Sequence, residues 1–366
     1  MGMSAGYYLA SQGVEVLLLD AFDPPHTFGS HHGDTRLLRH AYTGSRTYTE
    51  MALRADKLWT ELEQAAGEPL IVRSGVLNIG TPDSSLLAAK LERSNEYGIE
   101  LETLSSADMR NRWPGLTLPD SYTGIFEKRA GYLLSEACVS ACRRLAEAQT
   151  AVVRPFTPLR RLEVERGDVR AHTDQGVFTA KAAVLSLGAW FGGMGRLPRL
   201  PIRAYRKAVA WFEPAERKDL FEASAFPGFT IDGPGGSYYG FPSHGGSGVK
   251  IGRHDGGTEW TPGEPFEPFG HEAGDERELR LALEFMMPSA AGRLLRGSVC
   301  KYEMTPDEDF IIDRHPDYEQ VLLAGGFSGH GFKFASVVGE ILSELIIRGE
   351  TETDIRPFAL SRFRQV

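Results

Sequence analysis

The pattern of hydrophobic and polar positions along the chain is typical of an α/β protein. An apolar run over residues 14–19, broken only by Glu15, favours a strand buried on both faces of a parallel sheet. Residues 3–12 have helical spacing, and Gly13 is placed to end that helix. The same criteria predict helices over residues 46–64, 84–97, 135–149, 276–287 and 333–347, and extended segments over residues 70–80 (a strand pair), 99–104, 152–156, 162–164, 178–187 and 320–324.

The pattern changes between residues 200 and 299, where Pro, Gly and aromatic residues are frequent. Antiparallel strands are expected there over residues 208–213, 237–241 and 248–252. From residue 320 the strand–turn–helix pattern returns. We therefore expect a discontinuous nucleotide-binding domain and a smaller second domain with an antiparallel sheet, divided as residues 1–71, 136–202 and 303–366 for the first and 72–135 and 203–302 for the second.

The first helix and strand look like the second half of a βαβ dinucleotide-binding unit. In such a unit a strand and a G-x-G-x-x-G turn come before the helix. Here only Gly2 is placed to serve as the last glycine of that turn. Either the fold does not use the motif, or the chain begins after it; the second interpretation predicts a nucleotide-binding domain without its first strand.

Composition limits the classes of partner. The 366 residues are 42% hydrophobic and 24% charged, which is ordinary for a globular protein. The formal net charge of -9 makes nucleic acid and anionic membranes poor partners, and no apolar run reaches the ~20 residues that span a bilayer. The cysteines Cys138, Cys142 and Cys300 are odd in number and have no metal-ligand spacing, so we expect reduced thiols, a cytoplasmic protein and no metal site.

The segment after the first strand carries candidate binding residues. Asp20 ends the strand, where a carboxylate can accept hydrogen bonds from an adenosine ribose. Small and charged residues follow within a short stretch: Gly29, His31, His32, Gly33, Asp34, Arg36 and Arg39. This combination indicates a flat cofactor with an anionic substrate beside it; the alternative is a polar surface loop.

Two further segments suggest chemistry. Residues 325–333 place four glycines, among them Gly329 and Gly331, between a strand and a helix whose N-terminus favours negative charge. Lys333 at this turn could reach an anionic substrate, or the turn could be a tight βα connection with a solvated lysine. Lys250 lies inside an apolar strand, which indicates either a functional amine or a side chain that extends to the surface.

Cys300 follows Gly297, Ser298 and Val299 and precedes Lys301, a neighbour that would lower its pKa. On its own it is typical of a buried core thiol.

The segments DAFDPPHTFGSHHGDTRLLRHAY, RSGVLNIG, YYGFPS, VKIGRHDGG, GSVCKYEMTPDEDFIID and GGFSGHGFKFASVVGE together resemble the monomeric sarcosine oxidase and N-methyltryptophan oxidase family, in the family's order and over almost the whole chain. The resemblance implies a glutathione-reductase-type FAD domain and a smaller domain with an antiparallel sheet. It also implies oxidation of the N-methyl group of a secondary amino acid, with O₂ reduced to hydrogen peroxide.

The resemblance assigns a role to individual residues of this chain. Cys300 corresponds to the cysteine joined to FAD by a thioether, Lys250 to the lysine that activates oxygen, and Arg39 with Lys333 to the pair that holds the substrate carboxylate. The remaining implied positions lie along the cofactor and the substrate cavity: Gly2, Asp20, His32, Arg36, Tyr239, His254, Tyr302, Gly329 and Gly331.

The expected activity is demethylation of sarcosine to glycine and formaldehyde by a monomeric enzyme. N-methyl-L-tryptophan is the alternative substrate of the same family. A third possibility is an inactive remnant that binds an amino acid without FAD, because the N-terminal nucleotide motif is incomplete.

Overall fold

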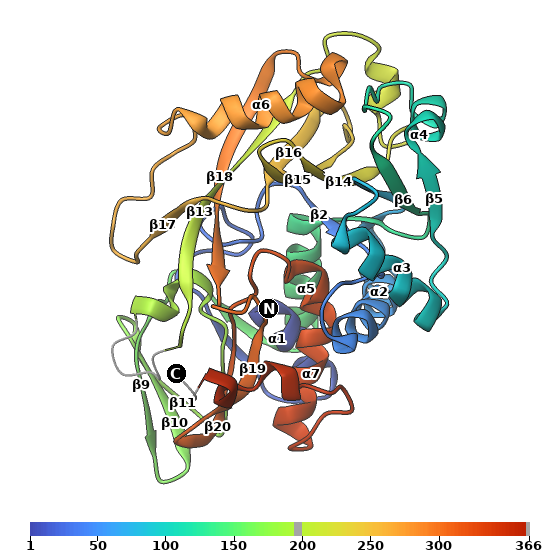
Figure 1. Ribbon diagram of the computed structural model, residues 1–366. Helices are drawn as coiled ribbons and strands as arrows, with labels where there is room; N and C mark the ends of the chain where they lie inside the picture. Colours follow the sequence, from blue (N-terminus) through green and yellow to red (C-terminus); the bar gives the residue numbers. More distant parts are fainter. Residues whose placement is uncertain (194–199, 364–366) are drawn as a thin grey trace.

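The computed structural model describes residues 1–193 and 200–363. It has two parts, with a large and mostly antiparallel sheet at one end, in which one pair of strands is parallel, and a group of helices with shorter sheets at the other (Figure 1). The α/β class with an antiparallel sheet in a second region is confirmed. The exact domain bounds remain a prediction.

The helical part is organised around α1 (Gly2–Ser11), which packs between α5 (Ser135–Ala148) and α7 (Ala335–Ile347). Gly339 allows the close approach of α7, because a Cβ there would collide with Ser4 of α1. The long helix α2 (Arg46–Ala66) begins with a Ser45 cap, ends at Gly67 in the left-handed conformation, and buries its apolar face in the same core.

The parallel strands of this part form two separate sheets. β1 (Leu17–Leu19) pairs with β8 (Val152–Arg154), and β12 (Ala183–Leu185) pairs with β20 (Tyr318–Gly325), which also pairs with β19 (Ile311–His315). Within the described residues, β1 and β12 have no other strand partner, and both line the cavity described below. The prediction of a strand over residues 14–19 buried on both faces was therefore wrong. The strand is shorter, and the side chain of Leu17, which lines this cavity, is 41% exposed.

The large sheet has nine strands, and helix α6 (Gly274–Met286) packs on one face of it (Figure 1). Its spatial order is β17 (Thr258–Trp260), β13 (Arg203–Phe212), β16 (Val249–Arg253), β15 (Gly236–Phe241), β14 (Gly228–Gly233), β4 (Val76–Gly80), β6 (Thr123–Glu127) and β5 (Glu102–Ser105), with β18 (Leu294–Met304) paired to β13.

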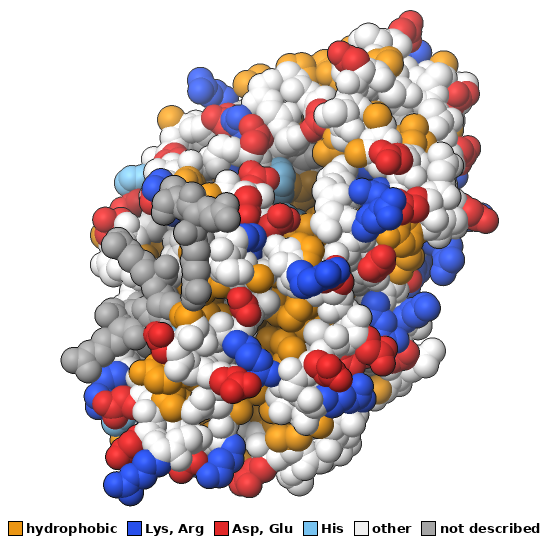
Figure 2. Space-filling view, turned by 60° about the horizontal axis from the view of Figure 1, so that its bottom comes forward, with side chains coloured by type: hydrophobic (Ala, Val, Ile, Leu, Met, Phe, Trp, Pro, Cys, Tyr) orange, Lys and Arg blue, Asp and Glu red, His pale blue; other side chains and the backbone are white. Residues whose placement is uncertain are grey.

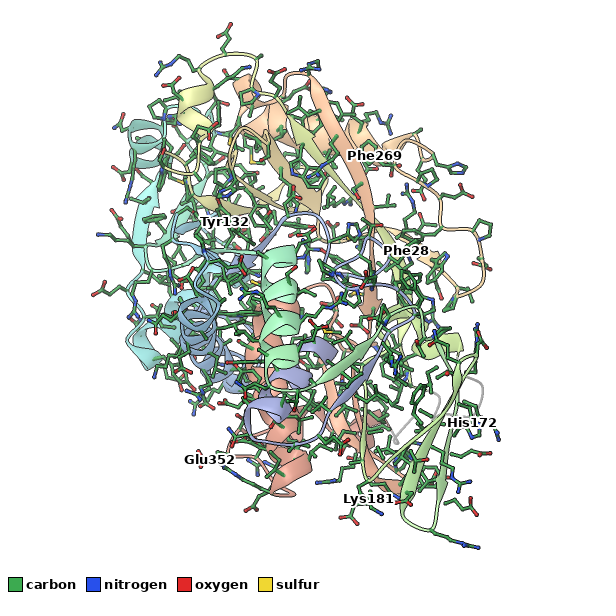
Figure 3. The ribbon with its side chains drawn as sticks, turned by 180° about the vertical axis from the view of Figure 1, so that it is seen from behind. Phe28, Tyr132, His172, Lys181, Phe269 and Glu352 are labelled. Carbon is green, nitrogen blue, oxygen red and sulfur yellow. The ribbon has the colours of Figure 1, made fainter. Side chains whose placement is uncertain are left out.

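Smaller elements complete the fold. A three-stranded sheet joins β2 (Thr35–Leu38), β7 (Gly131–Leu134) and β3 (Ile71–Val72), and an antiparallel meander is formed by β9 (Leu159–Glu165), β10 (Asp168–Thr173) and β11 (Gly176–Ala180). Two short helices, α3 (Ser85–Tyr97) and α4 (Ser106–Arg112), flank the large sheet (Figure 1). The reverse view places His172 on the meander, Lys181 just after it and Phe269 at the opposite end, with Phe28 between them (Figure 3).

Two predictions about strands were wrong. Residues 70–80 do not form a strand pair, because β3 and β4 belong to different sheets and the chain turns between them at Gly75, whose φ is +74°. Residues 178–187 are not one strand but parts of β11 and β12, separated by a bend.

No helix in the two described ranges is long and apolar enough to cross a membrane.

Candidate active site

A cavity of about 1660 Å³ lies between the helical part and the large sheet. Figure 2 shows a hollow in the middle of one face of the molecule with hydrophobic side chains at its bottom. Every site residue predicted from the sequence lines this one cavity: Gly2, Asp20, His32, Arg36, Arg39, Tyr239, Lys250, His254, Cys300, Tyr302, Gly329, Gly331 and Lys333. The fold thus brings together positions that come from both ends and the middle of the chain.

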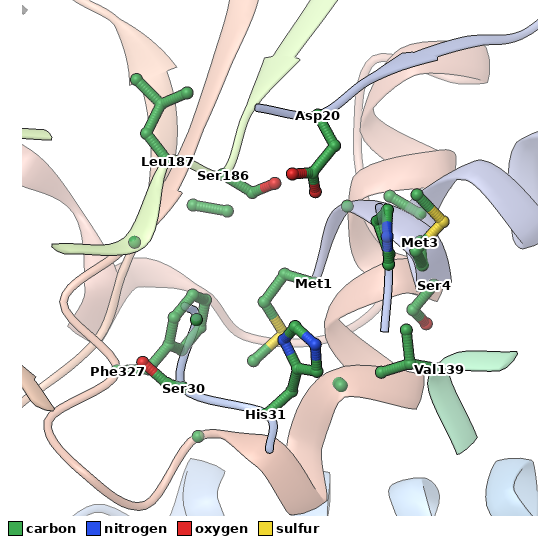
Figure 4. Close-up of a pocket in the computed structure, with 18 of the residues that line it drawn as sticks. Met1, Met3, Ser4, Asp20, Ser30, His31, Val139, Ser186, Leu187 and Phe327 are labelled. Atoms are coloured by element: carbon green, nitrogen blue, oxygen red, sulfur yellow. The ribbon is translucent and has the colours of Figure 1, made fainter. Parts of the chain in front are cut away.

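One end of the cavity has the features of a nucleotide site. Asp20 follows β1, and its Oδ1 accepts a hydrogen bond from the Phe22 amide at 2.9 Å. Gly2 is the first residue of α1, and a Cβ there would lie 2.8 Å from Oγ of Ser186, which follows β12. The side chain of Met1 lies between Asp20 and His31 in this part of the cavity (Figure 4).

The loop that precedes β2 is held in place by hydrogen bonds to its own backbone. Arg36 donates to the carbonyl oxygens of His32 at 2.6 Å, Thr35 at 2.7 Å and Ser30 at 2.8 Å. Glu136, in the first turn of α5, accepts from the amide of Gly33 at 2.6 Å. The guanidinium and the carboxylate therefore fix the loop from two sides and leave its cavity face available for a ligand.

His32 is buried in this loop, and its Nε2 has no hydrogen-bond partner among the described residues. Burial lowers the pKa of His32 to about 4, and the nearby Arg36 acts in the same direction. The imidazole is therefore neutral at pH 7 and can donate or accept one hydrogen bond from a bound group.

Lys250 projects from β16 into the centre of the site and is 2% exposed. Its ammonium donates to the carbonyl of Gly33, to the carbonyl of Thr35 at 3.0 Å and to Oγ1 of Thr35 at 3.2 Å. It also lies 5.2 Å from the ring centre of Trp211 and 4.7 Å from that of Phe241. Burial lowers the pKa of Lys250 well below its ordinary value, whereas these acceptors and rings favour the charged form.

Cys300 lies on β18 opposite Lys207 of β13, buried but lining the cavity. Burial raises the pKa of its thiol, and the cations of Arg36 and Lys250 act in the opposite direction. It is a free thiol, and so are Cys138 and Cys142. A buried thiol at the cavity wall among several cations is suited to react with a bound electrophile when it loses its proton.

Two tyrosines and a histidine lie beside this cysteine. The hydroxyl of Tyr302 donates to that of Tyr239 at 3.4 Å, and the ring centres of Tyr302 and His254 are 5.8 Å apart. Burial raises the pKa of Tyr239 to about 12, and burial lowers that of His254 to about 4. All three side chains are therefore uncharged at pH 7, so they shape the cavity without adding charge to it.

The glycine-rich turn after β20 packs closely against the sheet. A Cβ at Gly329 would collide with the ring of Tyr302, and a Cβ at Gly331 with Phe327. Gly329 has φ of +73°, which side chains other than glycine rarely adopt. Larger residues at these two positions would push the turn into the cavity.

Arg39 and Lys333 face the same aromatic ring. The Arg39 guanidinium lies 5.5 Å and the Lys333 ammonium 5.1 Å from the ring centre of Tyr42. Neither forms an ion pair with a carboxylate in the part of the chain that the structure describes, and Nε of Arg39 is buried without a hydrogen-bond partner. Burial lowers the pKa of Lys333, and Arg39 lowers it further. A bound carboxylate would satisfy both cations.

The residues present fit an FAD molecule. The cavity is larger than the ~300–1,000 Å³ of ordinary small-ligand pockets, as a dinucleotide requires. Asp20 lines the cavity where it follows β1, His32 lines it with an Nε2 that has no hydrogen-bond partner among the described residues, and Gly329 lets the turn pack directly against the Tyr302 ring. The thiol of Cys300 lines the same region.

The chain combines a nucleotide-type fold with a second sheet. The cavity between these two parts contains a buried lysine and two cations without a carboxylate partner among the described residues. These features are typical of a cofactor-dependent oxidoreductase. Comparison with protein families makes this specific: residues 1–345 match the family described as FAD dependent oxidoreductase, and the chain belongs to it.

Curated relatives support the same family. The chain is 46% identical over 365 residues to a monomeric sarcosine oxidase of Arthrobacter sp. (strain TE1826), covering 99% of this chain and 94% of that protein. It is 40% identical over 366 residues to an N-methyl-L-tryptophan oxidase of Salmonella typhimurium, covering 100% of this chain and 97% of that protein.

Solved structures share the fold. NikD, an amino acid oxidase of nikkomycin biosynthesis, superposes with a TM-score of 0.85 at 21% identity, covering 98% of this chain and 94% of that chain. L-proline dehydrogenase from P. horikoshii has a TM-score of 0.85 at 21% identity, covering 99% and 94% of the two chains. The FAD-binding fold with a second antiparallel sheet, expected from the sequence, is confirmed.

Sequence reasoning missed several residues of the site. Thr35 and Trp211 surround the Lys250 ammonium, and Glu136 holds the loop that precedes β2. Lys207 donates to the carbonyl of His254 at 2.8 Å and faces the Tyr302 ring at 5.0 Å. An acid in the first turn of a helix, such as Glu136, is normal for helix stability and gives no sign of this role. Lys207 follows Arg206 in the sequence, so it lacks the apolar neighbours on both sides that made Lys250 recognisable.

Proposed function

We propose that the protein is an FAD-dependent amine oxidase that demethylates sarcosine. Sarcosine, O₂ and water would give glycine, formaldehyde and hydrogen peroxide. The observation that carries the proposal is the pair Arg39 and Lys333, a half-buried and a buried cation that both face the Tyr42 ring and line the cavity, without a carboxylate partner among the described residues. The 46% identity to monomeric sarcosine oxidases over 99% of the chain supports the choice of substrate.

The roles of the side chains follow from their positions. Arg39 and Lys333 would bind the substrate carboxylate, and Tyr239 and His254 would form the wall that orients its N-methyl group. The FAD, when bound, supplies the redox chemistry by accepting the electrons of the N-methyl C–H bond. Lys250 would then hold positive charge beside the place where O₂ is reduced.

The cofactor contacts are part of the same proposal. Asp20 would bind the ribose, Gly2 would lie at the pyrophosphate, and His32 and Arg36 would face the flavin together with Gly329, Gly331 and Lys333. Cys300 would form a thioether to the flavin. The domain division given above, a monomeric state and a cytoplasmic location belong to this proposal as well; the name of the monomeric sarcosine oxidase reported above supports the monomer.

N-methyl-L-tryptophan is the second candidate substrate, because relatives that oxidise it by name are 40% identical over the whole chain. A peroxide assay with sarcosine, N-methyl-L-tryptophan and trimethylamine separates the candidates. We expect the highest kcat/KM for sarcosine and a very low value for trimethylamine, which has no carboxylate. A higher value for N-methyl-L-tryptophan would replace the substrate, and equal values for trimethylamine and sarcosine would contradict the carboxylate site. A visible spectrum without flavin bands would favour the inactive binding protein.

A further inference from the structure

One side of the hairpin formed by β14 and β15 lines the substrate part of the cavity. Paired residues of an antiparallel hairpin share a face, and Thr230 pairs with Tyr239 while Asp232 pairs with Ser237. All four line the cavity, whereas Ile231 on the other face is buried in the hydrophobic core of the large sheet; its partner Tyr238 belongs to that core and also lines the cavity. The wall around the tyrosine is therefore polar and includes one carboxylate.

Asp232 is linked to the Arg39 segment through Lys90. Its charge raises the pKa of Lys90, and the Lys90 ammonium donates to the carbonyl of Ala41 at 3.0 Å, two residues after Arg39. The amide of His254 donates to the carbonyl of Ser237 at 2.8 Å, so the strand position opposite Asp232 also contacts the predicted active-site histidine. Asp232 thus belongs to the substrate part of the cavity rather than to the nucleotide part.

The carboxylate of Asp232 has capacity for another donor. Oδ1 accepts from the hydroxyl of Ser237, and among residues 1–193 and 200–363 no Lys or Arg forms an ion pair with Asp232. The side chain is half-buried. An ionised carboxylate has about four acceptor sites, so one hydroxyl leaves most of them free.

The charges around the cavity are consequently of both signs. Arg39 and Lys333 are positive where they face Tyr42, and Asp232 of β14 contributes a carboxylate to the lining of the same cavity. Sarcosine has no side chain and would leave Asp232 unused. A larger amino acid bound through its carboxylate would place its side chain elsewhere in the cavity, where a terminal cation would gain a charge-assisted hydrogen bond.

We propose that Asp232 is a specificity-determining residue that lets the enzyme accept N-methyl amino acids with a cationic side chain, in addition to sarcosine. This inference rests on the proposed function, because it uses the same carboxylate site. Thr230 contributes a second polar group to this wall, although its hydroxyl already donates to Oδ1 of Asn78 at 3.0 Å.

The test compares Nα-methyl-L-ornithine with Nα-methyl-L-norleucine, which replaces the terminal ammonium by a methyl group of similar size. In the unmutated enzyme we expect kcat/KM to be at least about tenfold higher for the ornithine derivative, since a charge-assisted hydrogen bond contributes at least about 1.4 kcal/mol, which corresponds to tenfold. Asp232→Asn keeps the shape of the side chain and removes its charge, and it should bring the ratio close to one. Asp219→Asn, an exposed aspartate paired with Arg217, is the matched control and should keep the ratio.

A ratio near one in the unmutated enzyme, or an unchanged ratio in Asp232→Asn, would overturn the inference. Equilibrium binding of ornithine and norleucine to the holoenzyme gives the same comparison without turnover. If the two bind with the predicted preference but no N-methyl amino acid yields peroxide, the proposed function fails while the selectivity of Asp232 holds. If sarcosine yields peroxide and the two ligands bind equally, the proposed function holds and this inference fails.

Discussion

Nδ1 of His40 lies 2.5 Å from Oε1 of Glu127, and both side chains are buried. The other ring nitrogen lies 3.3 Å from Asp56 of α2, which also pairs with Arg73 at 2.6 Å. Glu127 ends β6 of the large sheet, so this buried chain of charges joins that sheet to the helical part next to the Arg39 segment. Such a group is stabilising only while all its members keep their charge.

The first prediction concerns pH and stability. Burial alone would lower the pKa of His40, but its interactions with the carboxylates of Asp56 and Glu127 outweigh burial and raise the pKa to about 9. A folded-state pKa above the ordinary 6.5 gives stability that is complete below about pH 6.5 and is lost as the pH rises through 9. The shift corresponds to roughly 3 kcal/mol at most.

His40→Gln should therefore lower Tm strongly at pH 6 and much less at pH 10, as measured by thermal unfolding at both values. His172→Gln is the control, because that imidazole contacts Glu163 on the surface of the meander, and its effect should be small at both values. An equal loss of Tm for His40→Gln at pH 6 and pH 10 would show that the imidazole stabilises by packing and not by charge.

Some parts of the fold and site follow from local sequence, and others do not. Lys250 could be recognised because a lysine in an apolar strand is unusual, but its acceptor Thr35 is 215 residues away in the chain and no local pattern joins them. Residues 70–80 alternate as a strand pair would, yet Gly75 directs the chain into a second sheet. β14 was missed because its sequence, GFTIDG, has only three consecutive strand-favouring residues between glycine and Asp-Gly; its neighbours β4 and β15 supply the pairing.

The second prediction tests covalent attachment of the flavin. If Cys300 forms the thioether, acid precipitation of the unmutated protein should leave the yellow colour in the pellet, and Cys300→Ser should release it into the supernatant. Cys138→Ser is the matched control, because that thiol is also buried and lines the same cavity but lies on α5 and not on β18. Colour in the supernatant of the unmutated protein would show that the flavin is held without a covalent bond.

The third prediction separates the two halves of the reaction at Lys250. Its ammonium faces carbonyl and hydroxyl oxygens and two aromatic rings, and it is positioned to stabilise negative charge that develops on O₂. Lys250→Met should slow reoxidation by O₂ by at least about 100-fold, a size typical of removing one electrostatic group, and should slow anaerobic reduction by sarcosine far less. Stopped-flow absorbance measures both rates. Lys250→Arg keeps the charge and should retain more of the reoxidation rate than Lys250→Met; equal losses in both half-reactions would show that the lysine is structural.

The fourth prediction concerns Arg39 and the substrate carboxylate. The guanidinium and the Lys333 ammonium share the Tyr42 ring, so a carboxylate placed between them would receive hydrogen bonds from two directions. Removing one charged donor typically costs about 1.5–3 kcal/mol, which is roughly 10- to 150-fold in binding. Arg39→Met should therefore raise KM for sarcosine by at least about tenfold.

The same substitution should also lower kcat, because the carboxylate contact sets the distance between the N-methyl group and the cofactor. Arg39→Lys keeps the charge but loses the planar pair of donors, so its KM should lie between those of the unmutated enzyme and Arg39→Met. Arg46→Met removes an exposed arginine that pairs with Glu96 at 2.8 Å outside the cavity, and it should leave KM and kcat unchanged. Steady-state peroxide assays over a range of sarcosine concentrations measure all four proteins. An Arg39→Met enzyme with unchanged KM would place the carboxylate elsewhere in the cavity, and a raised KM with unchanged kcat would show that Arg39 binds the substrate without orienting it.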